Sequence, residues 1–386
     1  MNAIPKFETM LADLVNTPSV SCTSPAEDQG NLHVIHHLAT WLADLGFDTE
    51  VMPLPDRPDK GNLIATLGEG ANGLVLAGHT DTVPYDEHAW QSDPFGLTVK
   101  ENAFYGLGAC DMKGFFPVAL EAIRELRAGD LNRPLTIVAT CDEESSMAGA
   151  RLLVDQDRPK ARYAIIGEPT GLTPIYAHKG IMMLSLKADG HTGHSSNPAL
   201  GCNALDAMSN VMLALTKFRK QLAEKHQHPG FEVAVPTMNF GCLHGGDNPN
   251  RICGQAELQI DLRLLPGMDS DAVLADLTHV AQAASAECGA PLTVTPFYPP
   301  VPPFESNPEG DLVRSLAQWS GHAPETVAFG TEGPFLQSLG METVIFGPGS
   351  IDQAHQPNEY LAIDQINPGK QALTNAIKRY CIDAGP

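Results

Sequence analysis

Two hydrophobic patterns follow one another along this chain, and their order limits the folds that it can adopt. Residues 134–140 and 163–166 are continuous apolar runs without polar alternation, which is typical of strands buried on both faces. Residues 31–45 and 112–126 carry apolar side chains at helical spacing. Further strands are expected at residues 48–54, 62–67 and 73–77. This alternation predicts an α/β fold with a mixed, mostly parallel sheet covered by helices on both faces.

A different order of elements begins near residue 179. Strand, helix, strand, strand, helix and strand are expected at residues 181–188, 203–222, 237–243, 252–265, 269–286 and 292–297. This is the order of a split, ferredoxin-like α+β unit, which is self-contained and can be inserted into another domain.

A proline-rich connector at residues 298–303 precedes a return to the first pattern. Helices are expected at residues 311–319 and 366–381, and strands at residues 327–330 and 343–346. We therefore predict a discontinuous domain at residues 1–178 and 298–386, with a second domain inserted at residues 179–297.

The charge of the chain excludes several classes of partner. Its formal net charge of -22 repels nucleic-acid phosphates and anionic lipid. We see no targeting segment at the N-terminus and no apolar run of the roughly 20 residues that a membrane span needs. The 8 cysteines are scattered and form no C-x-x-C pair, which favours free thiols and a cytoplasmic location.

Short polar motifs lie where predicted strands of the first domain end, and open α/β sheets place their ligands at such ends. His79 and Asp81 point to the same side of their strand, so a metal-binding imidazole held by a carboxylate is expected. Glu143 and Glu144 follow the run at 134–140 and converge only if the chain turns there. A solvated acidic loop is the simpler interpretation of these acids.

Three further motif residues have equally simple alternatives. Asp111 precedes a predicted helix, where an N-cap is common. Glu168 is held extended by the proline that follows it, and His355 lies in a loop of turn residues. Together, however, the motifs bring two histidines and three or four carboxylates to one domain, a ligand set that suits zinc, cobalt or manganese. Three carboxylate charges against two divalent ions leave a net positive site, which favours hydroxide over water and suits a hydrolase.

These motifs, in this order, resemble the aminoacylase and carboxypeptidase family of co-catalytic zinc hydrolases over essentially the whole chain. The stretches that carry the resemblance are GHTDTVP at 78–84, ACDMKG at 109–114, DEE at 142–144 and GEPT at 167–170. Others are similar to one bacterial deacetylase branch: EESSMAGA at 143–150, AHKG at 177–180, GHSS at 193–196, HGGD at 244–247, NRIC at 250–253, LPGM at 265–268 and, most specifically, GPGSIDQAHQPNE at 347–359.

The resemblance implies a zinc-peptidase-like catalytic domain and two Zn²⁺ sites, in which Co²⁺ can substitute. One ion would be held by His79 and Glu168 and the other by Glu144 and His355. Asp111 would bridge the two ions. Cys110 and Ser145 depart from the family pattern, in which alanine and threonine are more usual, but neither residue is at a ligand position.

The resemblance also implies roles for residues outside the ligand set. Asp81 would orient His79, and Glu143 would be the general base. His194, on the inserted lid, would reach the active site of a partner subunit and stabilise the oxyanion. A homodimer through the inserted domain is expected on this ground and because an exposed edge strand there needs a cover.

The expected substrate is a small N-acyl amino acid. Its carboxylate needs donors, and Arg263 with Asn250 or Arg251 is the candidate set, because an Arg fork matches a carboxylate. Surface salt bridging explains both arginines equally well. The metal-site motifs do not distinguish an N-acetyl amino acid from succinyl-diaminopimelate, or from a broader range of N-acyl amino acids or dipeptides. A metal-dependent binding protein is the non-enzymatic alternative, which a base such as Glu143 argues against.

Overall fold

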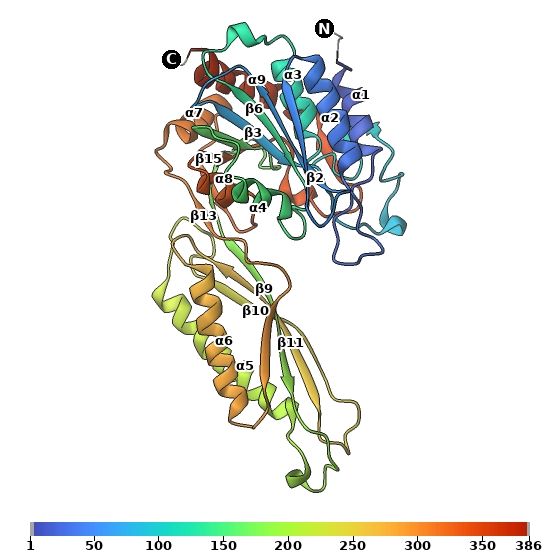
Figure 1. Ribbon diagram of the computed structural model, residues 1–386, viewed down its shortest axis with the longest axis vertical. Coiled ribbons are helices and arrows are strands. Elements are labelled where there is room, and N and C mark those ends of the chain that lie inside the picture. The colour runs from blue at the N-terminus through green and yellow to red at the C-terminus, as the bar shows by residue number, and fades with distance from the viewer. Residues whose placement is uncertain (1–3, 384–386) are drawn as a thin grey trace. The chain divides into compact units, whose positions relative to one another are not determined.

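The computed structural model describes residues 4–383 and consists of two compact units (Figure 1). The second unit comprises residues 177–305 and 326–330, and the first unit comprises the rest of the described chain. None of the helices between residues 4 and 383 combines the length and apolar character that crossing a bilayer requires.

The first unit is built on a mixed sheet with a parallel centre. Its strand order is β1-β2-β6-β3-β7-β15-β8. The strands are β1 (Asp48–Pro53), β2 (Gly61–Leu67), β3 (Leu74–His79), β6 (Leu135–Thr140), β7 (Tyr163–Ile166), β8 (Ile175–His178) and β15 (Glu342–Ile345). The pairs β6–β3, β3–β7 and β7–β15 are parallel, whereas β1–β2, β2–β6 and β15–β8 are antiparallel. Every residue of β3, β6 and β7 is buried, as continuous apolar runs predict.

Helices cover both faces of this sheet (Figure 1). One large apolar cluster joins one sheet face to α1 (Phe7–Val15), α2 (Leu32–Asp44), α3 (Phe115–Ile123), α7 (Asp311–Ser320) and α9 (Ile366–Ile377). On the other face, α4 (Ala148–Asp155) packs on α8 (Gly333–Ser338), which contacts β15. The predicted mixed, mostly parallel sheet with helices on both faces is therefore confirmed.

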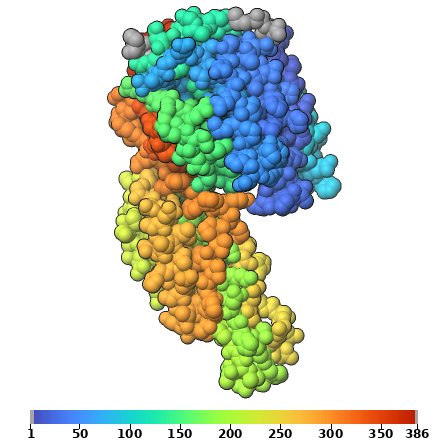
Figure 2. Space-filling view, viewed as in Figure 1, coloured from blue at the N-terminus to red at the C-terminus, as the bar shows by residue number. Residues whose placement is uncertain are grey.

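The second unit has one antiparallel sheet with two helices against it. The sheet has the order β10-β11-β9-β12, formed by β9 (Gly180–Asp189), β10 (Thr237–Gly245), β11 (Gln255–Leu264) and β12 (Leu292–Pro296). Alternate residues of β9 are buried, as one covered face requires. The helices α5 (Ala204–Lys225) and α6 (Ser270–Ala286) pack on each other and on the sheet, and orange atoms of α6 and the following residues form much of this unit's face in Figure 2. The element order is the predicted one.

Several local expectations were wrong or missing. The strand expected at residues 327–330 lies earlier, at β14 (Glu325–Val327). The helix expected from residue 112 begins only at Phe115, because residues 107–114 form consecutive turns. The sequence pattern also missed β13 (Phe304–Glu305) and a small sheet of β4 (Thr98–Lys100), β5 (Ala103–Tyr105) and β16 (Tyr360–Ala362) in the order β16-β5-β4.

Candidate metal centre

The parallel strands bring the predicted ligand residues to one edge of the first unit's sheet. His79 is the last residue of β3, and Glu144 follows the neighbouring β6. Glu168 follows β7, and His355 lies in the loop beyond β15. Because β6, β3, β7 and β15 are adjacent and parallel, their carboxyl ends meet. Asp111 comes from the turns before α3.

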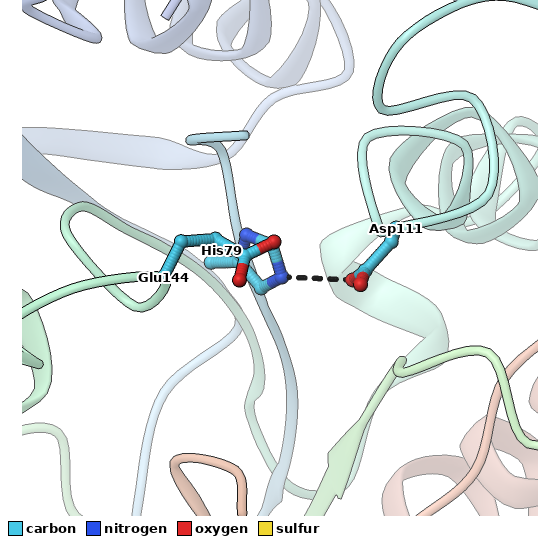
Figure 3. Close-up of side chains that lie close together, drawn as sticks. All are labelled: His79, Asp111 and Glu144. Atoms are coloured by element: carbon cyan, nitrogen blue, oxygen red, sulfur yellow. Dashed lines mark hydrogen bonds and ion pairs between the residues drawn. The ribbon is translucent and has the colours of Figure 1, made fainter. Parts of the chain in front are cut away.

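The side chains at this edge point toward one another. In Figure 3, a dashed line joins the His79 ring to the Asp111 carboxylate, and the Glu144 carboxylate is drawn across the same ring. The ligand atoms of these three residues lie within 4.8 Å of one another. His79 Nε2 is 3.1 Å from Asp111 Oδ1 and 3.9 Å from Glu168 Oε2. His355 Nε2 is 3.0 Å from Glu144 Oε2 and 3.6 Å from Asp111 Oδ2. The two oxygens of Asp111 thus face two different histidines.

The surroundings of His79 leave its Nε2 free to act as a ligand. His79 Nδ1 is 3.0 Å from the backbone oxygen of Asp81, to which the ring donates its N–H. The Asp81 carboxylate, expected to make this contact, lies 3.7 Å from Nδ1. One of its oxygens accepts the Glu144 backbone N–H at 3.0 Å, and the other has no hydrogen-bond partner. The backbone of Asp81 therefore sets the tautomer of His79, and its carboxylate holds the Glu144 loop.

The electrostatics of the cluster favour added positive charge. Burial, together with neighbouring carboxylates, raises the pKa of Glu143 and of Glu168 well above the usual value. Burial also raises the pKa of Asp81 to about 6. Burial alone lowers the pKa of His79, but contact with Asp111 and nearby acids outweighs it and raises the pKa. A hydrogen bond from the His355 ring to the Glu144 carboxylate raises the pKa of His355 to about 9. Buried acids that repel one another and imidazoles that attract protons are what a cation site presents. These residues therefore fit a pair of divalent ions.

Sequence reasoning missed several buried charged groups that surround this cluster. Lys60 donates to Asp28 and Asp142, 2.7 and 2.5 Å away. Glu332 accepts a hydrogen bond from Thr140, and burial raises its pKa to about 7. Their signal in the sequence is weak, because single charged residues outside any motif resemble ordinary surface positions.

Part of the predicted site lies in the second unit. The backbone of His194 forms a bridge with that of Arg251, and Asn250 accepts the Ser195 N–H at 3.1 Å. Arg263 lies elsewhere, near the far end of β11, where it pairs with Ile181 of β9. Its guanidinium contacts Asp261 at 2.8 and 3.0 Å. The structure therefore groups His194 with Asn250 and Arg251 and separates them from Arg263.

Residues 75–379 match the sequence pattern of the peptidase family M20/M25/M40. The chain belongs to this family. It is 45% identical to a Vibrio campbellii protein named acetylornithine deacetylase, over 98% of this chain and 99% of that protein. A Klebsiella pneumoniae protein of the same name is 44% identical, again over 98% and 99% of the two chains.

Solved structures of the family share this fold. A tripeptidase from Staphylococcus aureus superposes with a TM-score of 0.77 at 22% identity, covering 98% of this chain and 99% of that one. An M20 metallo-carboxypeptidase from Sulfolobus solfataricus gives 0.77 at 20% identity, with 97% and 99% covered. A dinuclear metal-binding peptidase of the family from Bacillus subtilis gives 0.67 at 15%, with 97% of both chains covered. Membership of this family confirms the prediction of a metal-dependent hydrolase.

Proposed function

We propose that this protein hydrolyses N2-acetyl-L-ornithine to L-ornithine and acetate, a step of arginine biosynthesis. The near full-length similarity to relatives of that name supports this substrate. We propose Zn²⁺ as the metal, in two sites, with Co²⁺ as a substitute. When bound, such ions polarise an amide carbonyl and lower the pKa of water.

The observation that supports two metal sites is the position of the Asp111 carboxylate. One of its oxygens lies 3.1 Å from His79 Nε2, and the other lies 3.6 Å from His355 Nε2. A carboxylate in this position can bridge two ions. We assign His79 and Glu168 to one ion, and Glu144 and His355 to the other. Each group then combines nitrogen and oxygen ligands of the kind that zinc accepts.

Glu143 is the proposed general base. It is buried beside the proposed ligand Glu144, and burial with neighbouring acids raises its pKa above the usual value, which favours uptake of a proton by this carboxylate. We propose that a Glu143 carboxylate oxygen accepts a proton from the attacking water and delivers it to the nitrogen of the leaving α-amine. The amide C–N bond breaks as this nitrogen gains the proton, and the acyl carbon leaves as acetate.

His194 is proposed to act in the neighbouring subunit of a homodimer. It is exposed, and its Nδ1 contacts the Ser196 hydroxyl at 2.8 Å. The chain enters this unit at Ala177, close to the start of β9. The ten residues of β9 span about 30 Å, and the loop that carries His194 follows the far end of this strand. An imidazole N–H from a partner subunit would donate a hydrogen bond to the oxyanion and stabilise it. Asn250 and Arg251, at the same end of the unit, are candidate donors to the substrate carboxylate, and Arg263 is a third candidate from another part of the sheet.

The second unit offers a surface for this dimer. β10 is an edge strand of its sheet, and all of its residues from Gly241 onward are exposed. A groove of about 420 Å³ runs between this strand and α5 and is lined mainly by apolar side chains that include Leu213, Phe240 and Leu243. An uncovered edge beside exposed apolar side chains is a surface that a second copy would protect.

Release of the free amine in the presence of zinc tests the activity, because acetyl and succinyl substrates both yield this product. The rate constants kcat/KM for N-acetylornithine, N-acetylmethionine and N-succinyl-diaminopimelate should be compared in one buffer. The proposal expects N-acetylornithine to be the preferred substrate. Preference for the succinyl compound would assign the site to a different acyl group, and no turnover of any substrate by zinc-loaded protein would contradict an enzymatic role.

A further inference from the structure

Glu359 is a buried acid that lies behind the metal centre and takes no part in the proposed chemistry. Its side chain is 1% exposed. It directly precedes β16, which pairs with β5, and β5 leads into the turns that carry Asp111. Glu359 also follows His355 by four residues. It therefore stands where the two loops that carry Asp111 and His355 meet.

The carboxylate of Glu359 binds the backbone of the Asp111 loop. Oε1 accepts the N–H groups of Cys110 at 2.7 Å and of Asp111 at 2.9 Å. Oε2 accepts the N–H of Gly108 at 3.0 Å. The backbone oxygen of Glu359 accepts a fourth N–H, from Gly106, at 3.1 Å. Both carboxylate oxygens are thus occupied by backbone donors, so this acid is poorly suited to be a ligand itself.

These contacts determine where the Asp111 side chain can lie. The backbone around Asp111 forms turns, not a helix or strand, so no regular hydrogen-bond ladder fixes it. Gly108, Cys110 and Asp111 are buried, and without Glu359 their N–H groups would lose their acceptor in a place shielded from water. Because Asp111 has one oxygen toward each histidine, a small shift of this loop would alter both contacts at once.

We infer that Glu359 is a positioning residue for the metal centre, which fixes the Asp111 loop against the His355 loop so that one carboxylate can serve two ions. The inference rests on the ligand set proposed above. Substitution of groups that orient metal ligands typically lowers metal affinity about 10–100-fold.

Glu359→Gln is the first test variant, because it keeps the shape of the side chain and replaces one acceptor oxygen by an NH₂ group that opposes a backbone N–H. Glu359→Asp is the second, because it keeps the charge but shortens its reach. The matched control is Glu342→Gln. Glu342 also accepts a backbone N–H, that of Leu312 at 2.9 Å, but it lies at the start of β15, away from the ligands.

Zinc affinity is measured by competition with a chelator, the ligand geometry by the visible spectrum of the Co²⁺-loaded protein, and folding by circular dichroism and thermal unfolding of the metal-free protein. We expect both Glu359 variants to fold, to bind zinc about 10–100-fold more weakly, and to change the Co²⁺ spectrum. The control should lose some thermal stability and keep the wild-type affinity and spectrum.

Wild-type zinc affinity and spectrum in both Glu359 variants would overturn the inference. Failure of both variants to fold would overturn it as well, since Glu359 would then serve the fold and not the site. If the wild-type protein bound no zinc in the same titration, the proposed metal centre would be refuted, and that outcome is distinct from the other two.

Discussion

Lys60 supplies the positive charge that holds the loop in front of Glu143. Its Nζ lies 2.5 Å from Asp142 Oδ1 and 2.7 Å from Asp28 Oδ1, and its side chain is only 3% exposed. Asp142 has a left-handed backbone, with φ of 58°, and precedes the proposed base directly. The Ser21 hydroxyl donates to the same Asp142 oxygen at 2.8 Å.

Lys60→Met should destabilise the first unit strongly. The methionine fills much of the lysine's space but leaves two buried carboxylates without their shared cation. Asp28 keeps Arg57, whose guanidinium is 2.5 Å away, whereas Asp142 keeps the Ser21 hydroxyl. Removal of one partner from a buried ion pair costs about 3–5 kcal/mol. For a unit of this size, that corresponds to a fall in Tm on the order of 10 °C.

Urea unfolding of the metal-free protein measures the loss, and two further variants test its cause. Lys60→Met combined with Asp142→Asn should be more stable than Lys60→Met alone, because the orphaned charge is gone. Arg57→Met is the control: its side chain is 44% exposed, and loss of such a pair costs at most about 1 kcal/mol. If Lys60→Met cost no more than Arg57→Met, or if Asp142→Asn recovered nothing, the reasoning would be refuted.

Four other predictions concern pH, the base, the dimer and its shared sites. Burial raises the pKa of Asp28, but hydrogen bonds from its two cationic partners outweigh this and lower it. Its contribution to the free energy of unfolding is therefore present above the ordinary value of 3.8 and is lost as the pH falls through the lower folded value; Asp28→Asn should flatten the acid limb of a stability curve measured by urea unfolding. Glu143→Ala should keep near-normal zinc content by elemental analysis and lose most turnover, whereas Glu144→Ala should lose metal as well, and wild-type activity in Glu143→Ala would contradict its role. An equal mixture of the Glu143→Ala and His194→Ala variants should regain about a quarter of wild-type activity after subunit exchange, since about half the dimers are mixed and each has one intact site. No regain of activity despite demonstrated exchange would exclude action of His194 across the dimer. Leu213→Glu places a charge in the apolar groove beside β10 and should give monomers in sedimentation at micromolar concentration, where we expect the wild type to be a dimer; a monomeric wild type would contradict the proposed dimer.

Local sequence patterns predicted much of the fold and led to the proposed ligand residues. Continuous apolar runs predicted the buried strands β6 and β7, because a strand covered on both faces has no polar side to alternate with. The predicted ends of such strands also indicated where ligand residues should lie, and His79, Glu144 and Glu168 are found there. These properties depend on residues near one another in sequence, so a single sequence carries them.

Tertiary structure decided how these groups meet. The ion pair of Lys60 with Asp142 joins positions 82 residues apart, and the hydrogen bonds of Glu359 to the Asp111 loop join positions 248 to 251 residues apart. Neither periodicity nor motif spacing contains the strand order β2-β6-β3-β7-β15 that brings such segments together. Tertiary structure also determined that the backbone oxygen of Asp81, and not its carboxylate, accepts the His79 N–H. The choice between these two acceptors depends on how tightly the chain turns after β3. Side-chain chemistry is local, whereas the position of one buried group relative to another is set by packing between distant segments.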